Sequence, residues 1–193
     1  YELMAGKAST EQTIRHTKVP GLDAISASID LAGAAIELVD QEHREYFLKN
    51  ALAPIKAEYD YIFIDCPPSL GILTLNGLAA ADAVLIPMQC EYFALEGITL
   101  LLQTVKRVQK SINTQLVIGG VFFTMYDSRT RLAQEVVKQV KAYFKDYVFS
   151  TIIPRNVRLS EAPSHHLPVC LYDPSCTGAK SYEKLAKEVM ERG

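Results

Sequence analysis

An aspartate directly follows a strongly apolar segment, and it is the first residue whose position suggests chemistry. The segment Tyr61–Ile64 is continuously apolar and rich in aromatic and β-branched residues, which is typical of a strand buried on both faces. Asp65 comes next, and Pro67 and Pro68 then stop the strand. Open α/β sheets bind ligands beyond the carboxyl ends of such strands, and nucleotide hydrolases hold Mg²⁺ with an aspartate in this place. We therefore predict that Asp65 binds Mg²⁺, directly or through water. The simpler alternative is a strand that ends in an Asp-initiated turn.

The elements that would position Asp65 alternate between strand and helix. Strands are predicted at Leu22–Ser26, Tyr61–Ile64, Ala83–Pro87, Leu116–Phe123 and Tyr147–Ile153. Helices are predicted from Ser9 or Thr10 to His16, at Leu31–Val39, Arg44–Lys56, Gly71–Ala81, Ala94–Ile112 and Thr130–Phe144, and from Cys176 or Thr177 onward. This alternation predicts an α/β fold with a doubly wound, mostly parallel sheet. We expect residues 1–193 to form a single domain.

The composition is that of an ordinary globular protein, with 49% hydrophobic and 22% charged residues. A net charge of −2 creates no general attraction to nucleic acid or to anionic membranes, so any such binding must come from a local patch. No apolar run reaches the roughly 18–20 residues that a membrane-spanning helix needs. The four cysteines form no C-x-x-C pair, which favours reduced thiols in a cytosolic protein.

The loops after the predicted strands are more particular than the fold. They are Ile64–Gly71, Ile86–Gly97, Thr124–Thr130, Ile153–Pro163, Tyr172–Pro174 and Gly178–Ala179, preceded by Pro20–Asp23 and Ala27–Ala34. Taken together and in this order, they closely resemble the chromosomal ParA/Soj family of partition ATPases. It implies a doubly wound P-loop NTPase fold. It also implies Mg-ATP binding, a homodimer formed across two nucleotides, DNA binding without sequence preference, and hydrolysis stimulated by a ParB/Spo0J-type partner.

The resemblance also implies roles for single residues. Asp65 would be the catalytic Walker B aspartate, and the loop Cys66–Gly71, which contains Pro67, would sense the γ-phosphate and the dimer partner. The segments that match the border of the adenine are Thr124-Met125 and Pro154-Arg155-Asn156. The simpler interpretation of Pro154–Asn156 is a turn that ends a strand.

One part of the family pattern is absent from this sequence. The phosphate loop, of the form K-G-G-V-G-K-T-T, has no counterpart, and the only Gly-Lys pair is Gly6-Lys7. We therefore expect the chain to be about the C-terminal three quarters of such a protein, without its first strand, P-loop and first helix. A full-length form would be an ATPase, whereas this chain alone should be inactive. Loss of the neighbouring strand should leave apolar strand edges exposed.

Basic residues suggest where DNA would bind. By the resemblance, Arg129 and Arg158, both expected in loops, would contact phosphates without reading sequence. A second basic group, Arg131, Lys138, Lys141 and Lys145, falls on one side of the predicted Thr130–Phe144 helix, where a solvated face is the simpler interpretation. The implied location is the bacterial cytoplasm, on the nucleoid.

Three alternatives stay open at this point. The first is a non-catalytic module that only dimerises or binds DNA or a partner protein, which the absent phosphate loop favours. The second is a membrane ATPase like MinD, but Lys180–Arg192 mixes both charge signs and is typical of a helix packed on a core, so we expect no membrane partner. The third is an iron–sulfur ATPase, for which Cys66 and Cys90 lack the expected spacing.

Overall fold

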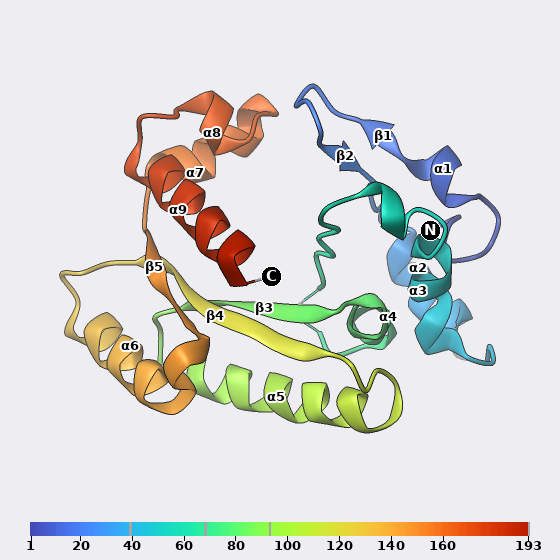
Figure 1. Cartoon of the computed structure of the whole chain (residues 1–193), viewed down its shortest axis with the longest axis horizontal. Helices are drawn as coiled ribbons and strands as arrows, with labels where there is room; N and C mark the ends of the chain where they lie inside the picture. The colour runs from blue at the N-terminus through green and yellow to red at the C-terminus, as the bar shows by residue number, and fades with distance from the viewer. Residues whose placement is uncertain (39, 68, 93, 193) are drawn as a thin grey trace. The chain divides into compact units, whose positions relative to one another are not determined.

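The computed structural model describes residues 1–38, 40–67, 69–92 and 94–192. They form two compact units, which are described separately (Figure 1). Unit 1 comprises Tyr1–Asp82 and Leu101–Leu116, and unit 2 comprises Ala83–Leu100 and Val117–Gly193. Three residues that the predictions include, Val39, Pro68 and Phe93, lie outside the described residues. That the whole chain forms a single domain stays a prediction.

Unit 2 is built on a parallel sheet of three strands in the order β3 (Ala83–Gln89), β4 (Val117–Tyr126) and β5 (Val148–Pro154). Both pairings are parallel, as the alternation of elements predicts. Figure 1 shows α6 (Arg131–Phe144) on one face of the sheet and α9 (Thr177–Arg192) on the other. The α/β fold with helices on both faces is therefore confirmed.

The core of unit 2 lies between these layers. On the α9 face, Phe149 and Ile153 pack with Leu185. On α6 the apolar spacing predicts that Leu132, Val136, Val140 and Phe144 face the core. The last three are buried, but Leu132 is 45% exposed and Ala133 is buried instead. On α9 the apolar spacing predicts that Tyr182, Leu185, Val189 and Met190 face the core. Leu185 is buried and Val189 packs against the core, whereas Tyr182 and Met190 are exposed, and Gly178 and Ala179 are buried.

Two short helices follow β5 where the sequence analysis expects loop. They are α7 (Val157–Glu161) and α8 (Val169–Tyr172), joined through the 3₁₀ turn η4 (Ala162–His165). Arg158 therefore lies on a helix, and the expectation of a loop position for it is wrong. The helix α7 has only five residues, which are too few to show an apolar period in the sequence. Its first turn is capped by the side chain of Asn156.

Unit 1 opens with α1 (Thr10–Thr13). Of the possible caps that the sequence offers, Ser9 or Thr10 with Gln12 or Thr13, the structure has a capping box of Ser9 and Gln12. The helix ends earlier than the predicted His16, because the chain turns extended at Ile14 and enters β1 (Arg15–His16). This strand pairs antiparallel with β2 (Asp23–Ala24), which is shorter than the predicted Leu22–Ser26.

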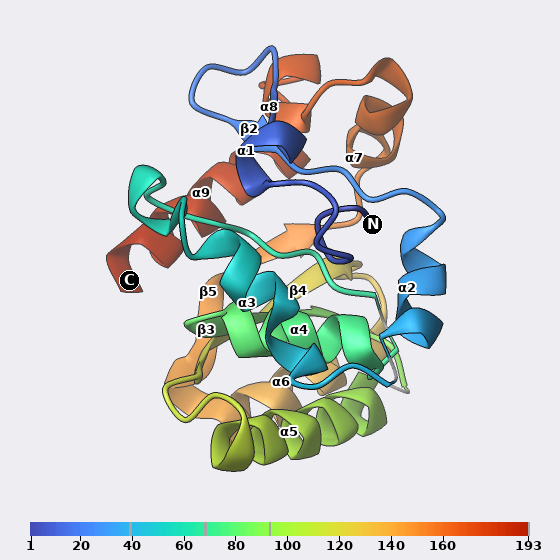
Figure 2. The same ribbon diagram turned by 90° about the vertical axis from the view of Figure 1, so that its right-hand side faces the viewer.

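The helices of unit 1 follow the prediction more closely. They are α2 (Leu31–Glu37), η1 (Arg44–Tyr46), α3 (Phe47–Leu52), η2 (Lys56–Glu58) and α4 (Ile72–Ala80). Figure 2 shows α3 beside α4, and buried Asn76 joins them by accepting a hydrogen bond from the backbone N–H of Leu48 at 3.0 Å. The predicted helix Arg44–Lys56 forms as η1 and α3, and α3 ends at Leu52, two residues before Pro54. The next turn, η2, begins at Lys56. The helix α5 (Ala94–Ser111) starts in unit 2 and ends in unit 1.

No helix among the described residues has the length and apolarity to cross a bilayer.

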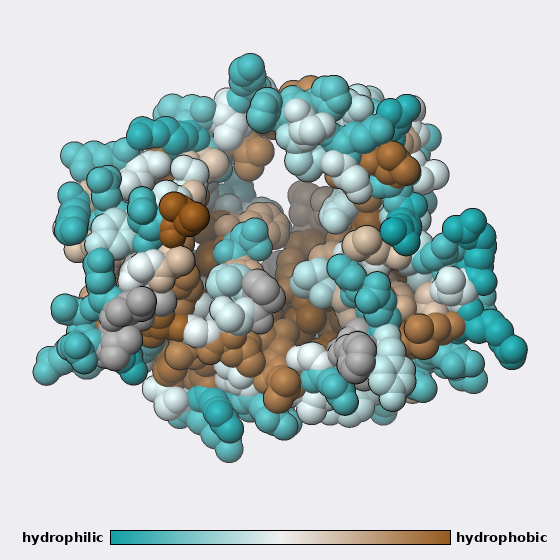
Figure 3. Space-filling view, turned by 180° about the vertical axis from the view of Figure 1, so that it is seen from behind, coloured by the Kyte–Doolittle hydropathy of each residue, from teal (hydrophilic) through white to brown (hydrophobic). Residues whose placement is uncertain are grey.

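The predicted buried strand Tyr61–Ile64 is wrong. The segment belongs to neither sheet, and its side chains are open to solvent, with Phe63 75% exposed. A strand needs a neighbouring strand that forms hydrogen bonds with its backbone N–H and C=O groups. Among the described residues, no strand pairs with this segment. Figure 3 shows hydrophobic residues at the surface among polar ones. In unit 1 the exposed large apolar side chains are Leu22, Ile25, Ile29, Tyr61, Ile62, Phe63 and Leu70.

The strand predicted at Ala83–Pro87 does form, but it is not buried on both faces. Ile86 and Met88 are buried, whereas Ala83 and Pro87 are exposed. The reason is that β3 is the end strand of the described sheet.

Candidate functional site

The loop after Asp65 is fixed to α4 within unit 1. The hydroxyl of buried Thr74 donates hydrogen bonds to the carbonyl oxygens of Pro67 and Ser69 at 3.3 and 2.6 Å. The Cys66 thiol lies so close to α4 that a Cβ added to Gly77 would be 2.6 Å from its sulfur. Glycine at position 77 and threonine at position 74 therefore let α4 hold this loop closely.

The Asp65 carboxylate is exposed, and no hydrogen bond or ion pair joins it to the described residues. A carboxylate oxygen is the ligand that Mg²⁺ prefers, and Mg²⁺ is often held by one or two carboxylates together with substrate phosphates. The chemistry of Asp65 therefore fits the predicted ion. The described residues contain no cluster of three or more histidine, cysteine, aspartate or glutamate side chains that could hold a metal. The catalytic and metal-binding roles of Asp65 and the role of Pro67 stay predictions.

The two segments that match the adenine border lie side by side in unit 2. Tyr126 and Pro154 are partners in the pairing of β4 with β5, and the backbone N–H of Arg155 donates to the carbonyl oxygen of Tyr126 at 3.0 Å. Met125 is half-exposed and has a positive φ of 51°, which turns the chain at the end of β4 beside Thr124. The parallel sheet therefore brings Thr124-Met125 and Pro154-Arg155 to one edge, as a shared site would require.

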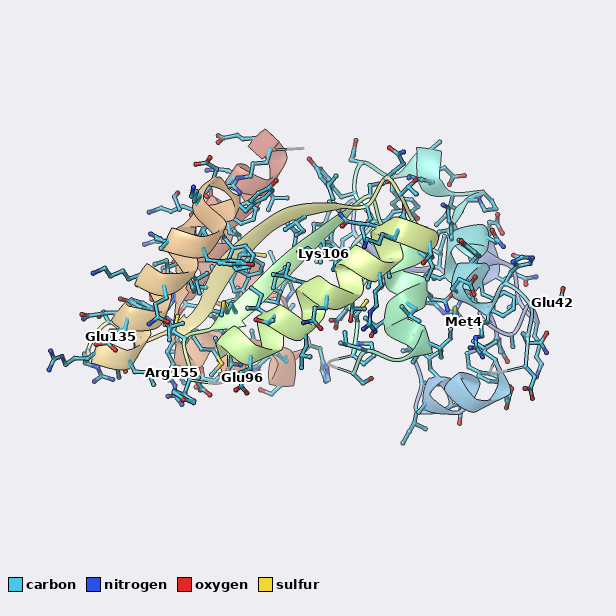
Figure 4. All side chains as sticks on the ribbon, turned by 90° about the horizontal axis from the view of Figure 1, so that it is seen from below. Met4, Glu42, Glu96, Lys106, Glu135 and Arg155 are labelled. Atoms are coloured by element: carbon cyan, nitrogen blue, oxygen red, sulfur yellow. The ribbon has the colours of Figure 1, made fainter. Side chains whose placement is uncertain are left out.

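Figure 4 shows the same edge from below. Arg155 is labelled between Glu96, in the first turn of α5, and Glu135 on α6. Both helices follow a strand of the sheet, so their amino-terminal ends and Arg155 lie at the carboxyl ends of the strands. The nucleotide-binding roles of Thr124, Met125, Pro154 and Arg155 stay predictions.

Asn156 has a structural use that the sequence analysis did not identify. Its side-chain oxygen accepts from the backbone N–H of Arg158 at 2.8 Å and so caps α7. Its side-chain nitrogen donates to the hydroxyl of Thr177 at 2.8 Å, at the start of α9. The side-chain oxygen of Asn156 therefore stabilises the start of α7, and its side-chain nitrogen joins α7 to the start of α9. The contact of Asn156 with adenine stays a prediction.

Arg129, one of the two predicted DNA-binding residues, is paired with Asp127. Its Nε and one terminal nitrogen donate to the two carboxylate oxygens at 2.9 and 2.7 Å, a bidentate arrangement. The backbone N–H of Arg129 also donates to Asp127, at 3.0 Å. These hydrogen bonds from Arg129, with a further contribution from the charge of Arg155, hold the pKa of Asp127 well below its usual range.

Arg158 is paired with two acids. A terminal nitrogen donates to Glu161 at 2.8 Å, and Nε lies 3.4 Å from a carboxylate oxygen of Asp173. The hydroxyl of Tyr172 donates to the same oxygen of Glu161 at 3.2 Å. Arg158 is the main cause that lowers the pKa of Glu161 below its ordinary value.

None of the three acidic partners, Asp127, Glu161 and Asp173, is among the residues predicted from the sequence. Two of them had a local signal, since Asp127 stands two residues before Arg129 in a turn and Glu161 stands three after Arg158. Asp173 lies 15 positions beyond Arg158 and is brought to it only by the fold of α7 and α8. The second basic group, Arg131, Lys138, Lys141 and Lys145, is exposed on and just after α6, on the side away from its buried residues.

Known proteins similar to this one align with the whole chain. A family model described as an AAA domain matches residues 1–118. The chain is 68% identical to the chromosome-partitioning ATPase Soj of Treponema pallidum over 192 residues, covering all of this chain and 76% of that protein. It is 50% identical to the chromosome-partitioning protein ParA of Myxococcus xanthus, covering all of this chain and 68% of that protein. Among solved structures it resembles a cobyrinic acid a,c-diamide synthase from Mycobacterium smegmatis with bound ADP and magnesium, with 35% identity and a TM-score of 0.83 over 98% of this chain and 70% of that one.

Proposed function

The chain belongs to the ParA/Soj family of chromosome-partitioning ATPases, and from this premise we propose that it is part of an ATP-driven switch that segregates DNA in the bacterial cytoplasm. Mg-ATP would drive formation of a homodimer, the dimer would bind nucleoid DNA without sequence preference, and a ParB/Spo0J-type protein would stimulate hydrolysis. The observation that supports this most is the meeting of Thr124-Met125 with Pro154-Arg155 at the carboxyl ends of β4 and β5. Parallel α/β sheets bind nucleotides at this edge.

In the proposed reaction Asp65 would hold Mg²⁺, and the ion would supply positive charge against the phosphates of the nucleotide. The residues at the ends of β4 and β5 border the adenine and orient the nucleotide. The loop that α4 fixes through Thr74 directly follows Asp65 in the chain, which supports the proposal that this loop senses the γ-phosphate. The similar cobyrinic acid a,c-diamide synthase has been solved with bound ADP and magnesium, which supports both cofactors at the level of the family.

DNA binding is proposed for Arg129 and Arg158. Their side chains are 86% and 52% exposed, so a DNA phosphate could reach both from solvent. Arginines that contact only phosphates give an affinity that falls steeply with salt and varies little with sequence. A dimer would present both residues twice.

The test uses a form of the chain extended upstream with the phosphate loop. We expect this form to hydrolyse ATP and to be stimulated by DNA and partner protein, and we expect Asp65→Ala to reduce kcat by at least about 100-fold. Full hydrolysis by Asp65→Ala would refute the assignment. If the extended form binds DNA and partner but hydrolyses no ATP, the chain is the non-catalytic module that the sequence analysis leaves open.

Binding of a fluorescent duplex of arbitrary sequence tests the DNA site. In the extended form with Mg-ATP, Arg129→Ala and Arg158→Ala should each weaken binding and reduce the salt slope by about one. Lys106→Ala removes the same charge from an exposed position of α5 and is the control. Equal effects of all three variants would mean that net charge, and not this site, determines binding.

A further inference from the structure

Both arginines proposed for DNA binding already have acidic partners in unit 2. Arg129 is held in a bidentate pair by Asp127, and Arg158 is held by Glu161 and Asp173. A carboxylate offers a guanidinium the same geometry as a phosphate, namely two oxygens for two parallel N–H groups. DNA phosphate and these carboxylates therefore compete for the same donors.

We propose that Asp127 and Glu161 are internal competitors of DNA, which lower the affinity of Arg129 and Arg158 for phosphate. This inference rests on the proposed function, since it concerns the regulation of the same DNA site. The acids would keep binding weak enough to be reversed, because each arginine must exchange a carboxylate for a phosphate when DNA arrives.

The exposure of the two pairs makes this exchange possible. The Arg129 side chain is 86% exposed, so a phosphate can reach its guanidinium from solvent. Exposed ion pairs have a small net stability, and an arriving phosphate can displace the carboxylate at little cost. The carboxylate then lies beside the bound phosphate and repels it, which further reduces the affinity.

The two sites should differ in strength. Arg129 has one acidic partner, so removing the charge of Asp127 leaves its guanidinium unpaired among the described residues. Arg158 keeps Asp173 at 3.4 Å when Glu161 is neutralised. One oxygen of Asp173 is also fixed by the backbone N–H and hydroxyl of Ser175, at 3.2 and 2.7 Å, which keeps this carboxylate in place. Neutralising Asp127 should therefore increase DNA affinity more than neutralising Glu161.

The experiment measures the affinity for a fluorescent duplex of arbitrary sequence in the extended form with Mg-ATP. Asp127→Asn removes the charge but keeps an oxygen that can accept the backbone N–H of Arg129, so the turn is preserved. We expect it to tighten DNA binding by about two- to fivefold, the factor that corresponds to one exposed ion pair. Glu161→Gln should tighten binding less, and both gains should shrink as salt is raised. Glu135→Gln removes an exposed acid of α6 that has no ion pair in the described structure, and it is the matched control.

The double variant Asp127→Asn/Arg129→Ala separates competition from a general change in charge. If Asp127 acts through Arg129, the gain vanishes when Arg129 is absent. Unchanged or weaker binding by Asp127→Asn, a gain equal to that of Glu135→Gln, or a gain that persists without Arg129 would each overturn the inference. If Arg129→Ala alone leaves DNA binding unchanged, the proposed DNA site itself is wrong, and the two failures are thereby distinguished.

Discussion

The carboxylate of Glu188 accepts two hydrogen bonds from Ser150, one from its backbone N–H at 2.8 Å and one from its hydroxyl at 2.6 Å. The backbone N–H of Thr151 donates to the same carboxylate at 3.0 Å, and the Thr151 hydroxyl also donates to it. Here the register of β5 against β4 is irregular, so these groups are not held by regular pairing. The helix α9 therefore completes the hydrogen bonding of β5 through one charged side chain.

Replacing Glu188 with glutamine should destabilise the protein. The variant turns part of an acceptor into a donor and removes the charge that strengthens these hydrogen bonds. We expect the free energy of unfolding to fall by about 1–3 kcal/mol in urea titrations. Glu191→Gln, an exposed acid of the same helix without a contact in the described structure, should change it little. Equal stability of both variants would show that this contact is dispensable.

The same contact predicts a pH dependence. Burial raises the pKa of Glu188, but the hydrogen bonds from Ser150 and Thr151 together outweigh it and hold the pKa below its ordinary value. The unfolded chain has the ordinary value of about 4.3, so the stabilisation is complete above about pH 5 and is lost as the pH falls through the lowered native pKa. The difference in stability between the parent and Glu188→Gln should therefore shrink on acidification. A difference that grows on acidification would contradict this account.

Gly120→Ala should be strongly destabilising. Gly120 has a φ of +157°, and an added Cβ would lie 2.3 Å from the ring of buried Phe149. Overpacking of this kind costs about 1–3 kcal/mol, and the backbone strain adds to it, so we expect a clear fall in the melting temperature. Gly97→Ala is the control, because its Cβ would meet nothing within 4 Å and the position is helical. A melting temperature unchanged by Gly120→Ala would show that β4 and Phe149 are packed differently.

Asn76→Ala should loosen the packing of α4 against η1 and α3. The side-chain nitrogen of Asn76 donates to the carbonyl oxygens of Arg44 and Ile72 at 2.8 and 3.0 Å, and its oxygen accepts from Leu48 at 3.0 Å. Asn76 is 1% exposed, so alanine removes these hydrogen bonds of a buried side chain, which costs about 1–3 kcal/mol. We expect lower stability in urea and faster amide exchange at Leu48. Asn50→Ala, on an exposed position of α3, should be neutral, and a neutral Asn76→Ala would contradict the role of this amide.

The sequence predicts this fold best where an element carries its own signal. The apolar period of α6 and the continuous apolar run of β4 follow from local composition, and both form within a few residues of the predicted bounds. The segment Tyr61–Ile64 has an equally strong run but does not form a strand, because pairing depends on a neighbour that local composition cannot supply. The apolar composition of a segment predicts that it can form a strand, but it does not predict that a neighbouring strand is present to pair with it.

The candidate site shows the same limit. Thr124-Met125 and Pro154-Arg155 could be placed together in advance, since carboxyl ends of parallel strands share one edge of a sheet. The pair of Arg158 with Asp173 could not, because it depends on two helices too short to show a period. The capping of α7 by Asn156 could not be predicted either, because α7 itself is too short to be predicted.

We propose that this chain supplies Asp65 and the residues that border the adenine, and that a phosphate loop absent from this sequence would hold the phosphates. The decisive measurement is equilibrium binding of Mg-ATP, made side by side for this chain and for the form extended upstream with the phosphate loop. We predict that only the extended form binds Mg-ATP and that Asp65→Ala then abolishes its DNA-stimulated hydrolysis. Tight binding of Mg-ATP by this chain alone would mean that another of its loops holds the phosphates, and would contradict the account.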